Sequence, residues 1–290
     1  DSAAEPVVQL DALLSGVGAL KAQPFRMDGS PLSHSRFFEE PGEDLEALFL
    51  SVLTRPLADF APILSQLPVD KPLALLMEVD CRLPEEQWRP AWQKAWRESG
   101  IRQSVVPVEG CGLAAVDRWL DQRIDDQALL MVLAVQLAPD RPEGTAEVVV
   151  GLLFGNRLTQ SALPPIAYLH RPEQQREPTD AGLLGSVRQS LDWAPLQAHS
   201  IEQVWRAVVG EQRPVESLLL DVPMPVKPPQ IFCNLDTLLG HAGKASPWLA
   251  IAAAAQTIER GAGPQFVFSG GAAADGLWST VLMPVSPLSK

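Results

Sequence analysis

The sequence lacks a basic surface, a disulfide framework and an apolar run of 18 or more residues. The formal net charge is −12 at pH 7, whereas proteins that bind duplex nucleic acid or anionic membranes need a basic patch. We therefore expect no nucleic acid among its partners. The three cysteines, Cys81, Cys111 and Cys233, are odd in number and scattered, which favours a reducing, cytoplasmic compartment. No spanning helix is expected, although a removed N-terminal anchor ahead of Asp1 stays compatible with the sequence.

Several motifs for metals and cofactors are also missing. There is no Cys-x-x-Cys and no His-x-x-x-His, so a structural zinc site is not expected. The chain has no Walker loop and no Gly-x-Ser-x-Gly, and Gly16-Val17-Gly18 alone is too weak for a dinucleotide fingerprint. We expect no bound metal and no cofactor.

The clearest local signals lie near the carboxyl terminus. Ser246 can cap a helix and Pro247 suits its first position, so the spacing predicts a helix over 246–260 with almost no polar face. The runs Phe266–Phe268 and Trp278–Met283 then predict two strands joined by a glycine-rich turn. A buried helix that leads into a hairpin indicates a core unit.

The middle of the chain predicts a parallel sheet. A strand at Leu73–Val79, a helix over 84–99 and a strand at Ile101–Val108 give the order β-α-β. A helix after Cys111 then precedes two strands within 128–154. The order of elements at 111–154 therefore matches that at 241–285, which indicates an internal duplication.

Other segments give simpler predictions. We expect the first helix to start near Glu43 and Asp44 and to stop before Pro56. The turn-rich stretch Leu158–Thr179 predicts a loop that crosses between the two halves. The remaining predictions are a helix at Gly182–Leu191, a helix at Ser200–Val209 and a strand at Val215–Val222.

Three tryptophans share one face of the helix over 84–99. Trp88, Trp92 and Trp96 are spaced at i, i+4 and i+8. One interpretation is a helix face packed on the sheet. Another is a stripe that binds a protein partner, since tryptophan contributes much interface energy. Base stacking is a third, and the acidic charge opposes it.

A family resemblance lies in the last fifty residues. The Gly240-His241 pair before a small-residue helix, and the Phe-Ser-Gly-Gly turn at 268–271 before an apolar strand, resemble the condensing enzymes, the β-ketoacyl synthase branch of the thiolase-like fold. The resemblance implies an α/β, thiolase-like fold in which internally duplicated helix plus β-hairpin units pack around mixed sheets. It places a leading helical segment at 1–70 and a thiolase-like domain at 71–290, with halves at about 71–156 and 180–290.

The same resemblance implies candidate catalytic residues and shows departures from the family pattern. Cys111 falls where the family has its nucleophile, and His241 falls where the family has its second histidine. The stretch that should hold the first histidine, WRAVVGEQRP at 205–214, has none, and Asp236 replaces an expected lysine. Loss of a base and a charged clamp weakens catalysis. We therefore expect a non-enzyme in which Cys111 is a small buried thiol and His241 a hydrogen-bonding residue at a helix entry.

A chain of this kind is expected to use its surface. The acidic, proline- and tryptophan-bearing sequence resembles adaptor proteins of bacterial type VI secretion clusters. That resemblance implies an adaptor or chaperone whose partner is a secreted lipase effector or a spike protein, bound through Trp88, Trp92 and Trp96, and the fold allows a homodimer. The alternative is an acyltransferase or condensing enzyme with Cys111 as nucleophile, which requires a thiolate that alkylates well below the roughly 8.5 pKa of a free cysteine.

Overall fold

The computed structural model describes residues 35–37, 44–123, 125, 127–140, 143–160, 162–207, 232–270 and 276–285. The chain divides into two compact units. Among these residues, the amino-terminal unit takes Arg36–Pro142 and Glu147–Pro164, and the carboxy-terminal unit takes Glu143–Ala146 and Pro165 onward. The predicted division at residue 70 stays a prediction.

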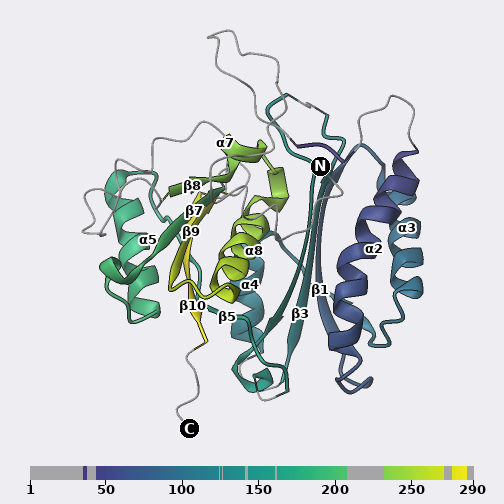
Figure 1. Ribbon diagram of the computed structural model, residues 1–290, viewed down its shortest axis with the longest axis horizontal. Coiled ribbons are helices and arrows are strands. Elements are labelled where there is room, and N and C mark those ends of the chain that lie inside the picture. The colour runs from purple at the N-terminus through teal and green to yellow at the C-terminus, as the bar shows by residue number, and fades with distance from the viewer. Residues whose placement is uncertain are drawn as a thin grey trace. The chain divides into compact units, whose positions relative to one another are not determined.

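The amino-terminal unit is built on a four-stranded mixed sheet with the order β2-β1-β3-β4 (Figure 1). Strand β1 is parallel to both β2 and β3, while β3 and β4 form an antiparallel hairpin. This arrangement confirms the predicted β-α-β unit and the hairpin that follows it. The strands are β1 (Leu73–Cys81), β2 (Val105–Pro107), β3 (Leu129–Leu137) and β4 (Val148–Gly155).

Helix α2 (Leu45–Leu64) is longer than the sequence predicted. The expected stop before Pro56 is wrong, because the helix continues through both Pro56 and Pro62. A proline inside a helix costs about 3 kcal/mol, and burial of a leucine or phenylalanine returns about 1.5–3 kcal/mol each. Three such residues flank Pro56, namely Leu53, Leu57 and Phe60, and all are at most 8% exposed. Packing of the buried face therefore outweighs the missing hydrogen bond.

The start of α2 also differs in detail. Asp44 precedes the helix as its N-cap, and its carboxylate accepts hydrogen bonds from the backbone N–H groups of Glu46 and Ala47.

Among the described residues, α2 alone is long and apolar enough to cross a membrane by length and composition. Its buried face, however, packs against β4 and the next helix, α3 (Glu85–Glu98). Core helices meet the same two criteria.

The sheet of the amino-terminal unit has two apolar faces. Alternate β3 residues such as Met131 and Leu133 belong to the core cluster formed with α2 and α3. The residues between them, such as Leu130 and Val132, are also fully buried, and alternation places them on the opposite face. A sheet covered on both faces explains why β3 reads as one continuous apolar run.

The carboxy-terminal unit contains a six-stranded sheet. Five strands follow the order β5-β10-β9-β7-β8, and β6 pairs with β10. Strand β7 is parallel to β8 and β9, whereas β9 and β10 are antiparallel. The strands are β5 (Ala167–Leu169), β6 (Glu173–Gln174), β7 (Gln203–Ala207), β8 (Phe232–Asn234), β9 (Gln265–Gly270) and β10 (Leu277–Pro284).

Two helices cover this sheet. Helix α5 (Asp180–Trp193) forms a core cluster with Phe266 and Phe268 of β9. Helix α8 (Ser246–Glu259) also packs on β7, β9 and β10, and Figure 1 shows the strands between the two helices. The helix predicted over 246–260 and the hairpin after it are confirmed. Ser246 is the first helical residue rather than the cap, which is Ala245.

The two sheets share one topology. The order β2-β1-β3-β4 in the first unit matches β8-β7-β9-β10 in the second, with the same parallel and antiparallel pairings. The helix before each first strand packs on the last strand, since α2 contacts β4 and α5 contacts β10. The predicted α/β fold with internally duplicated units and mixed sheets is therefore confirmed.

Two other predictions are wrong. The expected helix at Ser200–Val209 is strand β7, in which Val204 and Trp205 are both fully buried. Burial on both faces removes the alternation that marks a half-buried strand. The expected loop at Leu158–Thr179 contains β5 and β6, which pair with β10. The strand predicted at Val215–Val222 lies outside the described residues.

A close approach between α2 and β4 generates a prediction. A Cβ atom at Gly151 would lie 2.8 Å from Pro56 Cβ and 2.9 Å from Phe60 Cε2. Gly151→Ala should therefore destabilise the amino-terminal unit by roughly 1–3 kcal/mol, measured as the urea midpoint from tryptophan fluorescence. The control is Gly185→Ala on α5, where a Cβ meets nothing within 4 Å and alanine should add about 0.5–1 kcal/mol. Equal midpoints for Gly151→Ala and the parent chain would contradict this packing.

Candidate active site

Cys111 lies at the carboxyl edge of the amino-terminal sheet. It follows β2 and is the N-cap of α4 (Gly112–Gln122). The flanking residues Gly110 and Gly112 have φ angles of 105° and 54°, which glycine adopts without a steric penalty. The carboxyl ends of parallel strands are where open α/β sheets place ligands. The expectation of a buried thiol is wrong, because Cys111 is exposed.

A carboxylate holds the amino end of α4. Glu78 comes from β1, is only 6% exposed, and its Oε1 accepts a hydrogen bond from the Gly112 backbone N–H. In β1, Leu75 and Met77 pack in the α2 cluster, so alternation directs Glu78 to the opposite face. The positive end of a helix stabilises an anion. That end of α4, directly beside Cys111, already holds the Glu78 carboxyl group.

The other two cysteines are poor nucleophiles. Burial raises the pKa of the Cys233 thiol to about 12. Burial also raises the pKa of the half-buried Cys81 thiol, and the negative charge of Asp80 adds to the rise, although a backbone hydrogen bond at Leu83 lowers the pKa. Neither group will be a thiolate near neutral pH. Any thiol chemistry of the described residues therefore falls to the exposed Cys111.

His241 lies at the carboxyl edge of the second sheet. It follows β8, the short helix α7 (Leu235–Leu239) and Gly240, whose φ is 100°. Its backbone is fixed on both sides, because its N–H donates to Gly144 O at 2.8 Å and its carbonyl accepts from Ala146 N at 2.9 Å. The predicted hydrogen-bonding role at a helix entry therefore belongs to the main chain of His241.

The His241 ring lies next to an acidic partner. Its Nδ1 is 3.5 Å from Asp236 Oδ1, with side-chain exposures of 37% for His241 and 11% for Asp236. The resembled family has a lysine at this position. The replacement at 236 thus reverses the charge beside this histidine.

The structure places the two candidate catalytic residues in different units. Cys111 belongs to the amino-terminal unit and His241 to the carboxy-terminal unit. His199, near the position of the missing first histidine, is exposed and lies in the turn before β7. The segment 208–214, where the family motif would continue, is outside the described residues.

No group of three or more His, Cys, Asp or Glu side chains that could hold a metal ion occurs among the described residues. The expectation of no metal rests on the sequence and stays a prediction.

The tryptophan stripe packs against α2 and within the core cluster of the amino-terminal unit. Trp92 is 8% exposed, and Trp88 and Trp96 are half-buried. The Trp88 ring lies 6.1 Å from Phe49 of α2, and the Trp92 and Trp96 rings are 5.3 Å apart. Figure 1 shows α3 beside α2. Trp92 belongs to the core cluster that also contains residues of α2, β1 and β3, as the core interpretation predicts, and the partner-binding role stays a prediction.

Sequence reasoning missed Glu78. The signal was present, because Glu78 is the only charged residue in the run Leu73–Val79. A charge inside an otherwise apolar strand needs a buried partner. The sequence could not show that this partner is the backbone of residue 112.

Comparisons with known proteins agree with this topology. No family model and no curated protein matches the chain. Solved structures do match. An SCP2-thiolase like protein described as monomeric, from Mycobacterium smegmatis, has a TM-score of 0.57 at 11% identity, with 88% of this chain and 77% of that chain covered. The acyltransferase ChlB3 has a TM-score of 0.55 at 14% identity, with 86% of each chain covered.

A third match includes a partner protein. A type II polyketide synthase ketosynthase solved with its acyl-carrier protein, AntDE:AntF, has a TM-score of 0.57 at 9% identity, with 96% of this chain and 93% of that chain covered. At such identities the similarity shows the fold alone. This chain therefore has the thiolase-like fold, as the resemblance of its sequence to the condensing enzymes predicted.

The buried carboxylate next to Cys111 generates a second prediction. Glu78→Gln removes the negative charge from the amino end of α4, so alkylation of Cys111 by iodoacetamide at pH 7.5 should become about two- to fivefold faster. Peptide mass spectrometry measures the rate at each cysteine separately. Glu86→Gln, an exposed change on α3, is the control and should leave the rate unchanged. An equal rate in the Glu78 variant would mean that this carboxylate does not control the thiol.

A third prediction concerns the tryptophan stripe. Trp92→Ala should lower the free energy of unfolding by about 3–5 kcal/mol, because it opens a cavity in the core. Trp193→Ala, at a site that is 44% exposed, should cost less than about 1 kcal/mol. Chemical denaturation compares the two. If Trp92→Ala is as mild as Trp193→Ala, Trp92 is a surface residue and the core assignment fails.

Proposed function

We propose that this chain is a non-catalytic binding protein with the thiolase-like fold. The observation that carries the proposal is the contact between Glu78 and the Gly112 N–H. A condensing enzyme needs the amino end of this helix to stabilise a cysteine thiolate. Here that end binds a carboxylate of the same chain, and a second negative charge at Cys111 would be repelled.

The carboxy-terminal unit supports the same proposal. A histidine that holds a thioester oxygen must donate a hydrogen bond, and a nearby cation strengthens that donor. Asp236 stands where the resembled family has a lysine and lies 3.5 Å from the His241 ring. No histidine occurs within 205–214, so no base comes from the position of the first family histidine.

The partner of such a protein would be another protein. AntDE:AntF, one of the structural matches, is a ketosynthase in complex with its acyl-carrier protein, so one protein with this fold binds another. In this proposal the chain is an adaptor or chaperone, and a secreted lipase effector or spike protein of a type VI system is the partner to test first. That partner identity rests on the sequence resemblance alone. A homodimer is compatible with the proposal.

An acyltransferase or condensing enzyme is the second candidate. A specific observation favours it, namely that Cys111 is exposed and caps α4 at the carboxyl edge of the sheet. The match to the acyltransferase ChlB3 concerns the same fold. In this candidate Cys111 would accept the acyl group of a thioester, and the thiol of the donor would leave.

Intact mass after incubation with acyl-thioester donors separates the two candidates. The full-length chain is mixed with acetyl-, hexanoyl- and decanoyl-coenzyme A, with Cys111→Ala as the control. The non-catalytic proposal predicts no stable adduct on the parent chain, because the amino end of α4 beside Cys111 already holds the Glu78 carboxyl group. An adduct that forms on the parent chain and is absent from Cys111→Ala would contradict it and make His241→Ala the next variant.

A further inference from the structure

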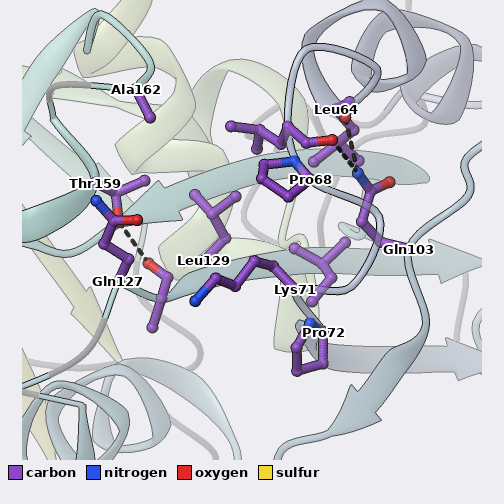
Figure 2. Close-up of a pocket in the computed structure, with 12 residues that line it drawn as sticks. Leu64, Pro68, Lys71, Pro72, Gln103, Gln127, Leu129, Thr159 and Ala162 are labelled. Carbon is purple, nitrogen blue, oxygen red and sulfur yellow. Dashed lines mark hydrogen bonds between the residues drawn. The ribbon is translucent and has the colours of Figure 1, made fainter.

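A small pocket opens at the amino edge of the four-stranded sheet, the edge opposite Cys111. It has a volume of about 60 Å³. It forms where α2 ends at Leu64 and where β1 and β3 begin at Leu73 and Leu129. Figure 2 shows Leu64 and Leu129 around the opening, together with Pro68 and Ala162. The pocket lies entirely within the amino-terminal unit.

The polar side chains of the lining already have partners. Gln103 Nε2 donates to Leu64 O at 2.8 Å, and Gln127 Nε2 donates to Leu158 O at 3.2 Å. The Thr159 hydroxyl lies 3.0 Å from Ala128 O. These bonds, two of them drawn in Figure 2, tie the walls together. The interior that remains is apolar.

The lining has one charged residue, Lys71. Its side chain is exposed at the rim, and Figure 2 shows it beside Leu129 and Pro72. No described carboxylate forms an ion pair with it. A chain whose net charge is −12 therefore presents a cation at the mouth of an apolar pocket. Of the six large apolar residues that are exposed among the described ones, Ile63, Val69 and Leu158 adjoin this lining in sequence.

We propose that this pocket binds an aliphatic monocarboxylate, with its branched or short alkyl group in the pocket and its carboxylate on Lys71 Nζ. The size supports a small group, since a cavity of about 150 Å³ accommodates benzene and this one has a volume of about 60 Å³. The shared chemistry has two sources. One is a free short-chain fatty acid, and the other is the terminal carboxylate of a peptide that ends in leucine, isoleucine or valine.

The inference is independent of the proposed function. The pocket and Cys111 lie at opposite edges of the sheet, so failure of one proposal leaves the other unchanged. The two proposals are also tested by different measurements. Ligand binding tests the pocket, and the mass of a covalent adduct tests Cys111.

The test is a titration of the ¹⁵N-labelled full-length chain followed by NMR. The ligands are 4-methylpentanoate, the uncharged 4-methylpentanamide, and acetyl-Gly-Leu with a free or an amidated terminus. We expect saturable shifts at residues of the lining with both carboxylates. Lys71→Met should weaken binding by about three- to fivefold, as expected for an exposed ion pair. Lys94→Met, an exposed change on α3, should leave affinity unchanged, and Ala162→Trp should block the pocket.

The outcomes decide between the sources as well. Tighter binding of acetyl-Gly-Leu than of 4-methylpentanoate identifies a peptide terminus as the ligand, and the reverse identifies a free acid. The proposal is overturned if no carboxylate gives saturable shifts at the lining, or if the amides bind as tightly as the acids. It is also overturned if Lys71→Met and Lys94→Met behave alike.

Discussion

A buried carboxylate on β1 needs a donor, and the amino end of α4 supplies it. Glu78 is 6% exposed and accepts the Gly112 N–H. A buried charge without such a partner costs several kcal/mol. The contact therefore ties the central strand of the first sheet to the start of the helix that carries Cys111. The same contact that stabilises this unit places a negative charge where a condensing enzyme needs a positive potential.

The duplicated topology gives the two units the same kind of sheet edge. Each unit brings parallel strands to a carboxyl edge, and this edge holds Cys111 in one unit and His241 in the other. A position at the carboxyl edge makes a side chain accessible to a ligand, but it does not activate that side chain as a nucleophile or a base. Activation depends on the charges nearby, and Glu78 and Asp236 are both acidic. The fold of this chain therefore does not by itself determine whether Cys111 and His241 are catalytic.

Much of the fold could be predicted from local patterns. Helix α8 and the β9–β10 hairpin followed from Pro247 and from two short apolar runs, and the order of elements revealed the duplication. What failed depends on tertiary packing. The continuation of α2 through Pro56 rests on burial of Leu53 and Leu57, and β7 lacks alternation because both its faces are covered.

The candidate site was predictable in its residues but not in its electrostatics. The position of Cys111 before a helix and of His241 after Gly240 was visible in the sequence. The partnership between Glu78 and Gly112, 34 residues apart, requires the strand to lie beside the helix start. The exposure of Cys111 likewise depends on the turn formed by Gly110 and Gly112, whose φ angles are positive.

Genetic complementation tests the central claim most directly, because it does not depend on the identity of the partner. The double variant Cys111→Ala/His241→Ala is expressed, at the level of the parent chain, in a strain of the source organism that lacks the gene. The account predicts that the double variant restores the phenotype as fully as the parent chain does. Loss of complementation by a stably folded double variant would contradict a non-catalytic role and would establish chemistry at these two residues.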